Sequence, residues 1–184
     1  DVDHCGACGT ACDAGMSCVR GVCLDPCTEG QTLCAFDEPA CVDLDVDARN
    51  CGRCGHRCGP GTTCQAGKCA CDADAPAAAF QADVLPVFES SCGGKSCHSG
   101  TNELTSLDLS PAVAYAQLVG VASEGESCTS SRVVAGAPDD SFLVDKLLGG
   151  DLCYGKRMPR QDDALGDEAV GRIIGWICAG AADD

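Results

Sequence analysis

The residues best suited to chemistry are two cysteines and a histidine in the stretch Cys92-Gly-Gly-Lys-Ser-Cys97-His98. This order is the one in which haem is attached covalently: each sulfur adds to a vinyl group of the porphyrin, and the histidine that follows binds the iron. The spacing is CxxxxCH, two residues longer than the usual CxxCH, so the loop must bulge to bring both sulfurs to the porphyrin. The same residues also fit a Cys92–Cys97 disulfide in a small secreted domain, in which His98 takes no part.

A second potential iron ligand is Met158, which stands directly before Pro159. A methionine sulfur is a soft, neutral ligand that suits haem iron opposite a histidine. The alternative role for Met158 is to fill a gap in a hydrophobic core. Because the chain has only two methionines and this one precedes a proline, we favour the ligand role.

Four helices are expected to position these residues. The first begins near Asp83, has Pro86 in its first turn and leads into Cys92. A second is predicted from Ser110-Pro111 to Gly120, and a third over about 138–148. The fourth is predicted from Asp167 to about Ala179, because apolar residues recur there at helical spacing: Val170, Ile173, Ile174 and Ile177.

Taken together, the haem-attachment order, the Met-Pro pair and the amphipathic helix after it resemble those of a monohaem class I cytochrome c. The resemblance covers residues 77–181 and is to the CxxxxCH kind found in secreted bacterial proteins. It implies an all-α, cytochrome c-like domain over residues 80–184 that binds one haem c. Cys92 and Cys97 would form the thioether bonds, and His98 and Met158 would be the axial ligands.

With both axial positions filled, the iron has no place for a substrate, so the resemblance implies an electron carrier and not an enzyme. A redox partner protein or an extracellular acceptor would receive the electron. Lys95, Lys156 and Arg157 would then form a basic spot at the haem rim of an acidic protein.

Three further cysteines lie in the C-terminal half. Cys128 and Cys153 bracket the third helix, and we expect a disulfide between them that clamps the loop carrying Met158. Cys178 is then left over on the last helix, either as a buried thiol or as a bridge to another chain. Self-association through Cys178 or through the N-terminal repeats is therefore a hypothesis.

The N-terminal 71 residues contain an internal repeat with a period of 46 residues, in which Cys5-Gly-Ala-Cys8 returns as Cys51-Gly-Arg-Cys54. The two copies cover about 1–27 and 28–71, and residues 72–79 form a linker without cysteine. The repeats resemble Cys-rich repeats of bacterial surface proteins. Few large apolar residues are present, so we expect loop-dominated, disulfide-rich units with little regular structure.

The repeats hold fourteen cysteines, an even number that fits a self-contained disulfide set. Cys34 and Cys41 have no counterparts in the first copy and most simply pair with each other. The six cysteines left in each copy allow fifteen connectivities. A zinc site on the CxxC pairs is the alternative, which the density of cysteines disfavours.

Composition points outside the cytoplasm, because nineteen cysteines in 184 residues mark a disulfide scaffold from an oxidising compartment. The net charge of −16 would repel nucleic acid and anionic lipid. No apolar run is long enough to span a membrane, so the chain is expected to be secreted or at the cell surface, with a lipid anchor on a missing N-terminus as one option.

The leading functional interpretation is therefore extracytoplasmic electron transfer by a single c-type haem, with the Cys-rich repeats as a stalk or assembly module. The alternative is a haem-free, disulfide-rich adhesion or spacer protein. A haem peroxidase-like enzyme and a unit of an electron-conducting polymer are the remaining hypotheses.

Overall fold

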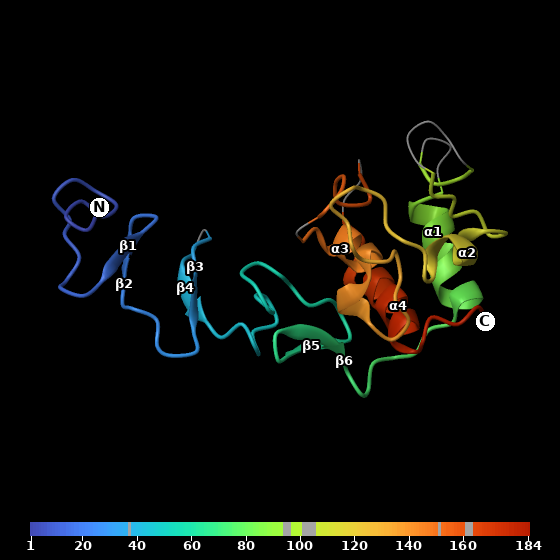
Figure 1. The fold of residues 1–184 in the computed structure, drawn as a ribbon, viewed down its shortest axis with the longest axis horizontal. Helices are drawn as coiled ribbons and strands as arrows, with labels where there is room; N and C mark the ends of the chain where they lie inside the picture. The colour runs from blue at the N-terminus through green and yellow to red at the C-terminus, as the bar shows by residue number, and fades with distance from the viewer. Residues whose placement is uncertain (37, 94–96, 101–105, 151, 161–163) are drawn as a thin grey trace.

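The computed structural model describes residues 1–36, 38–93, 97–100, 106–150, 152–160 and 164–184. Three small hairpins follow one another from the N-terminus, and the helices gather in the C-terminal half (Figure 1). Each hairpin is a separate two-stranded antiparallel sheet. The strands are β1 (Ser17–Val19) with β2 (Val22–Leu24), β3 (Thr32–Cys34) with β4 (Ala40–Val42), and β5 (Thr62–Gln65) with β6 (Lys68–Cys71). The disulfide-rich character predicted for this half is confirmed, but the half carries three hairpins where little regular structure was expected.

The two repeat copies share one pattern of disulfides. In the first and third hairpins two cysteines face each other across the strands, and each bonds to a cysteine that precedes the hairpin. The equivalent bonds are Cys5–Cys18 with Cys51–Cys64, and Cys12–Cys23 with Cys58–Cys69. These small units therefore replace an apolar core with covalent cross-links.

A close backbone contact accompanies this pattern. A Cβ on Gly52 would lie 2.3 Å from the carbonyl oxygen of Gly67, and Gly52 has a positive φ of +71°. Gly6 meets Gly21 in the same way in the first copy, at 2.6 Å. Only glycine allows both the left-handed backbone and the close approach.

The expected Cys34–Cys41 disulfide is wrong. Cys34 is bonded to Cys54, and Cys41 to Cys27. The hairpin register explains why: Cys41 lies opposite Leu33, and Cys34 lies opposite Ala40. Because neighbouring residues of a strand point to opposite faces, Cys34 and Cys41 lie on different faces of the hairpin and bond to different neighbours.

The C-terminal half is built around one hydrophobic core. A turn of π-helix, η1 (Phe80–Val84), leads into α1 (Leu85–Ser91), and η1 packs against α4 (Asp167–Cys178). The rings of Phe80 and Trp176 lie 5.0 Å apart between centroids, and Phe88, Ile173 and Ile177 are fully buried around them. The predicted first and last helices are thus present, the first beginning at Phe80 and not at Asp83.

This half is nevertheless not the all-α, cytochrome c-like domain that the sequence predicted. The remaining helices are short: α2 (Ala114–Leu118), the 3-10 turn η2 (Pro138–Asp140) and α3 (Phe142–Leu148). Between α2 and η2 the chain runs through turns and bends, with isolated bridges from Val119 to Val133 and from Ala122 to Ser131. β-branched valines favour extended backbone, which is why the helix expected up to Gly120 ends at Leu118.

The second repeat is attached to the C-terminal half. Cys71, at the end of β6, is bonded to Cys178, at the end of α4. A Cβ on Gly59 would lie 2.3 Å from Cδ1 of Ile174, so the loop before β5 lies directly on α4. The two roles expected for Cys178, a buried thiol or a bridge to another chain, are therefore both wrong, and so is the proposed self-association through it.

Candidate functional site

Three of the four predicted haem-binding residues line one cavity. Cys92, His98 and Met158 border a space of about 490 Å³ that opens to the surface. Its walls are mostly apolar and come from α1, α2, α3 and the loops between them; they include Phe88, Leu109, Leu118, Phe142 and Leu147. The structure thus brings together residues that are sixty positions apart in the chain.

Among the described residues, hydrogen bonds to Cys92, Leu107 and Leu109 hold His98 in place. Its backbone N–H donates to the carbonyl of Cys92 over 3.0 Å, and its own carbonyl accepts from the N–H of Leu109 over 2.7 Å. The ring Nδ1 lies 3.2 Å from the carbonyl oxygen of Leu107. Because a carbonyl only accepts, Nδ1 carries the proton, and Nε2 is the nitrogen whose lone pair can bind a metal. A carbonyl on the other ring nitrogen is the usual support of a metal-binding histidine.

Asp108 fixes the segment that follows His98. Its Oδ1 accepts from the backbone N–H groups of Gly100, over 3.0 Å, and of Ser110, over 2.9 Å. Hydrogen bonds from Ser110 and then from Gly100 lower the pKa of Asp108 below its ordinary value. Sequence reasoning missed this role; the signal was an Asp two residues before Ser110, the spacing of an Asx turn.

The two cysteines of the motif differ in environment. Cys92 is half-buried at the end of α1 and Cys97 is exposed. Burial, and next the neighbouring Cys97, raise the pKa of the Cys92 thiol to about 11. Together with Cys8 they are the cysteines outside every disulfide in the described part of the chain. The Cys92–Cys97 bridge that the sequence also allowed is not formed.

Met158 is half-buried in a loop attached to the end of α3. The N–H of Met158 donates to the carbonyl of Lys146 over 2.8 Å, and Nε of Arg157 donates to the carbonyl of Leu147 over 3.0 Å. The expected disulfide between Cys128 and Cys153 is present and ties this loop to the preceding extended segment. The position of Met158 is therefore set by backbone contacts and a covalent bond.

Basic side chains border the cavity of this strongly acidic protein. They are Arg132, Lys146, Lys156 and Arg160. Lys146 lies over the ring of Phe142, 5.2 Å from its centroid, and burial lowers the pKa of its ammonium. Three residues were expected to form a basic spot here. Lys156 borders the cavity, Arg157 donates to the carbonyl of Leu147 in α3, and Lys95 lies outside the described residues.

The CxxC pairs considered for zinc cannot bind it as pairs, because disulfide bonds occupy at least one cysteine of each. Cys5, Cys51 and Cys54 are all disulfide-bonded, so these sulfurs are not available as thiolate ligands. Eight disulfides in the described residues indicate an oxidising, extracytoplasmic environment.

Comparisons of the chain with protein-family models, with curated proteins and with solved structures find no match. Within the described ranges, none of the helices has the length and apolar character needed to cross a membrane.

Proposed function

We propose that this protein carries electrons outside the cytoplasm through one covalently bound c-type haem. Cys92 and Cys97 would form the thioether bonds, and His98 and Met158 would bind the iron. The observation that carries the proposal is that Cys92, His98 and Met158, from distant parts of the sequence, line one largely apolar cavity.

The residues around the cavity fit such a group. The carbonyl of Leu107 presents His98 in the tautomer that a metal ligand needs. Apolar walls exclude water, which favours the less charged, reduced state of an iron centre. Lys156 and Arg160 are cations suited to the carboxylates of a porphyrin, whereas Arg132 is already paired with Glu124 over 2.9 Å.

The haem would supply a one-electron couple, and the protein would supply position, insulation and docking. Since His98 and Met158 would occupy both axial positions, no site is left for a substrate, and the role is transfer and not catalysis. Residues 1–71 would act as a stalk or assembly module, because their cross-linked hairpins extend from the second half of the molecule (Figure 1).

The alternative is a haem-free surface spacer, favoured by the disulfides that run through the repeats and on into the C-terminal half. This alternative requires no haem chemistry at Cys92 and gives Met158 no role beyond packing.

One experiment separates the two functions. The chain is produced in a host that attaches c-type haem, and its oxidised and dithionite-reduced spectra are recorded together with a haem stain of a denaturing gel. We expect a sharp reduced α band and a stain that survives denaturation, both lost in Cys92→Ser/Cys97→Ser and retained in Cys8→Ser, which removes the other exposed thiol. A colourless wild-type protein would refute the haem proposal.

A further inference from the structure

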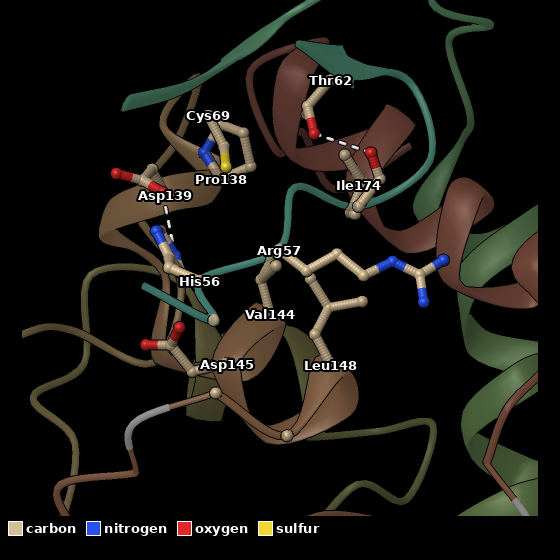
Figure 2. A pocket seen from close by; sticks show the side chains of 14 residues that line it. His56, Arg57, Thr62, Cys69, Pro138, Asp139, Val144, Asp145, Leu148 and Ile174 are labelled. Atoms are coloured by element: carbon tan, nitrogen blue, oxygen red, sulfur yellow. Dashed lines mark hydrogen bonds and ion pairs between the residues drawn. The ribbon is translucent and has the colours of Figure 1, made fainter. Parts of the chain in front are cut away.

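A second, small cavity lies where the second repeat meets the C-terminal half. It measures about 40 Å³ and is bordered by His56 and Cys69 from the repeat and by Asp139, Asp145 and Ile174 from the other side. Figure 2 shows the imidazole of His56 directed at Asp139, with Asp145 on the other side of the ring. Nothing in the proposed electron transfer uses these side chains.

His56 is held in a defined orientation. Its side chain is 9% exposed, and Nδ1 lies 2.7 Å from the carbonyl oxygen of Cys51. The carbonyl accepts, so Nδ1 carries a proton and Nε2 is the nitrogen that faces outward from the repeat. Nε2 lies 3.4 Å from Oδ1 of Asp139.

Oδ1 of Asp139 is buried and, within the described residues, has no hydrogen-bond partner. The N–H of a protonated ring would therefore not point at this oxygen, although the two atoms are only 3.4 Å apart. A buried carboxylate oxygen without a hydrogen bond costs free energy, as does an imidazole lone pair facing a carboxylate. A cation placed between Nε2 and Oδ1, off the line that joins the two atoms, would remove both of these costs.

We propose that His56 and Asp139 bind a divalent transition-metal ion, with zinc as the best-fitting example. Zinc lies about 2.0–2.1 Å from a histidine nitrogen and about 2.0–2.2 Å from a carboxylate oxygen, which in a tetrahedron separates the two ligand atoms by about 3.3–3.5 Å. The separation of 3.4 Å between Nε2 and Oδ1 matches this edge. The hydrogen bond from Nδ1 to the carbonyl of Cys51 is the usual outer support of such a ligand.

The other residues around the cavity leave His56 and Asp139 as the protein ligands. Asp145 also borders the cavity but lies on the other side of the His56 ring from Asp139 (Figure 2), so water would fill the remaining positions around the metal. The sulfur of Cys69 is bonded to Cys58 and so offers no thiolate. Arg57 borders the cavity, but its guanidinium points away from His56 (Figure 2). Asp140 is ion-paired with Lys68 over 3.5 Å on the surface and takes no part.

The metal would connect the repeat to η2, beside the covalent connection from Cys71 to Cys178. The site is built from residues of both halves, so it exists only when the two are docked. Its role would be structural, to hold the stalk at a fixed orientation to the rest of the molecule.

The test is a calorimetric titration of the disulfide-intact, 184-residue chain with ZnCl₂ after treatment with EDTA. The chain is produced without haem attachment, and the thiols of Cys8, Cys92 and Cys97 are first blocked with iodoacetamide, which removes competing thiolates. We expect one equivalent of zinc to bind the wild type, and Asp139→Asn and His56→Gln to weaken binding at least tenfold. Asp140→Asn is the matched control, because it removes the neighbouring carboxylate and should leave zinc binding unchanged.

A second readout does not depend on variants. In the wild type, zinc should shift the Nε2 resonance of the His56 ring in ¹⁵N NMR spectra, while the Nδ1 proton is retained. Equal zinc affinity in Asp139→Asn, Asp140→Asn and the wild type would overturn the proposal. The proposal would also be overturned if the His56 ring carried both protons and its resonances did not change on addition of zinc. A proton would then lie between Nε2 and Oδ1.

Discussion

Cys71, the last residue of β6, is bonded to Cys178, the last residue of α4, across 107 residues of sequence. The bond closes almost the entire C-terminal half into one loop. It also explains why the repeat cysteines do not form a self-contained set, as the even count of fourteen had suggested.

Removing this disulfide should destabilise the protein. In the chain-entropy model, a cross-link that closes a loop of about 100 residues contributes roughly 4–5 kcal/mol, and removing a native disulfide from a small secreted domain typically costs about 2–5 kcal/mol. We expect the double variant Cys71→Ser/Cys178→Ser to lose stability within that range, measured by urea unfolding of the C-terminal half. An unchanged midpoint would show that the loop is already constrained in the unfolded state.

Replacing Met158 should separate haem attachment from haem ligation. In Met158→Ala we expect haem that still stains on a denaturing gel, a lower reduction potential, and carbon monoxide binding to the reduced protein, because the sixth position is open. Met16, the other methionine in the chain, lies in the first repeat, so Met16→Ala is the matched control. If Met158→Ala behaved like Met16→Ala, Met158 would not be the ligand.

Asp108 should make the His98 segment sensitive to acid. Its pKa is lowered in the folded state by hydrogen bonds from Ser110 and Gly100, so its contribution is present above the ordinary Asp pKa of about 4 and is lost as the pH falls through the lowered value. We expect stability to fall in this acidic window, and Asp108→Asn to be less stable at neutral pH with a shallower pH dependence. Urea midpoints between pH 7 and pH 2 measure the difference. Parallel curves for both proteins would contradict the assignment.

The contact between Gly52 and Gly67 predicts a position-specific effect of alanine. Gly52→Ala adds a Cβ at 2.3 Å from a backbone oxygen, whereas Gly61→Ala, also at a positive φ, meets only the Cβ of Ala75 at 3.4 Å. The left-handed backbone alone costs about 1–2 kcal/mol. We expect Gly61→Ala to remain near that cost, and Gly52→Ala to exceed it and to reduce the yield of the Cys51–Cys64 disulfide. Peptide mapping of the disulfides measures the yield, and similar yields for the two variants would refute the steric argument.

Local patterns predicted the elements that depend on local sequence. The apolar spacing from Val170 to Ile177 predicted α4, and of the four residues singled out for haem binding, Cys92, His98 and Met158 do line one cavity. These patterns each lie within a short stretch of sequence, so they could be recognised without a structure. The all-α interpretation was wrong because the segment after α2 pairs with itself through isolated bridges, Val119 with Val133 and Ala122 with Ser131, and such pairing is not encoded by helical propensity.

Disulfide pairing and the His56 site could not be predicted for the same reason. Cys34 bonds to Cys54 because strand alternation turns it away from Cys41, a fact that depends on the register. In the second repeat the residue that corresponds to His4 is Asn50: His4 accepts from the N–H of Gly9, and Asn50 accepts from the N–H of Gly55. His56 takes the place of Thr10, and this departure from the repeat was the signal available in the sequence.

The Cys71–Cys178 bond also determines how the molecule would respond to a pulling force. Tension applied between the repeats and the residues after Cys178 would pass from β6 through the sulfur atoms to the end of α4. The 106 residues between the two cysteines, including those around the large cavity, would lie outside this path and would not be stretched. A protein fixed to a surface by its repeats could thus be dragged by flow or by a neighbouring cell while its cavity keeps its shape.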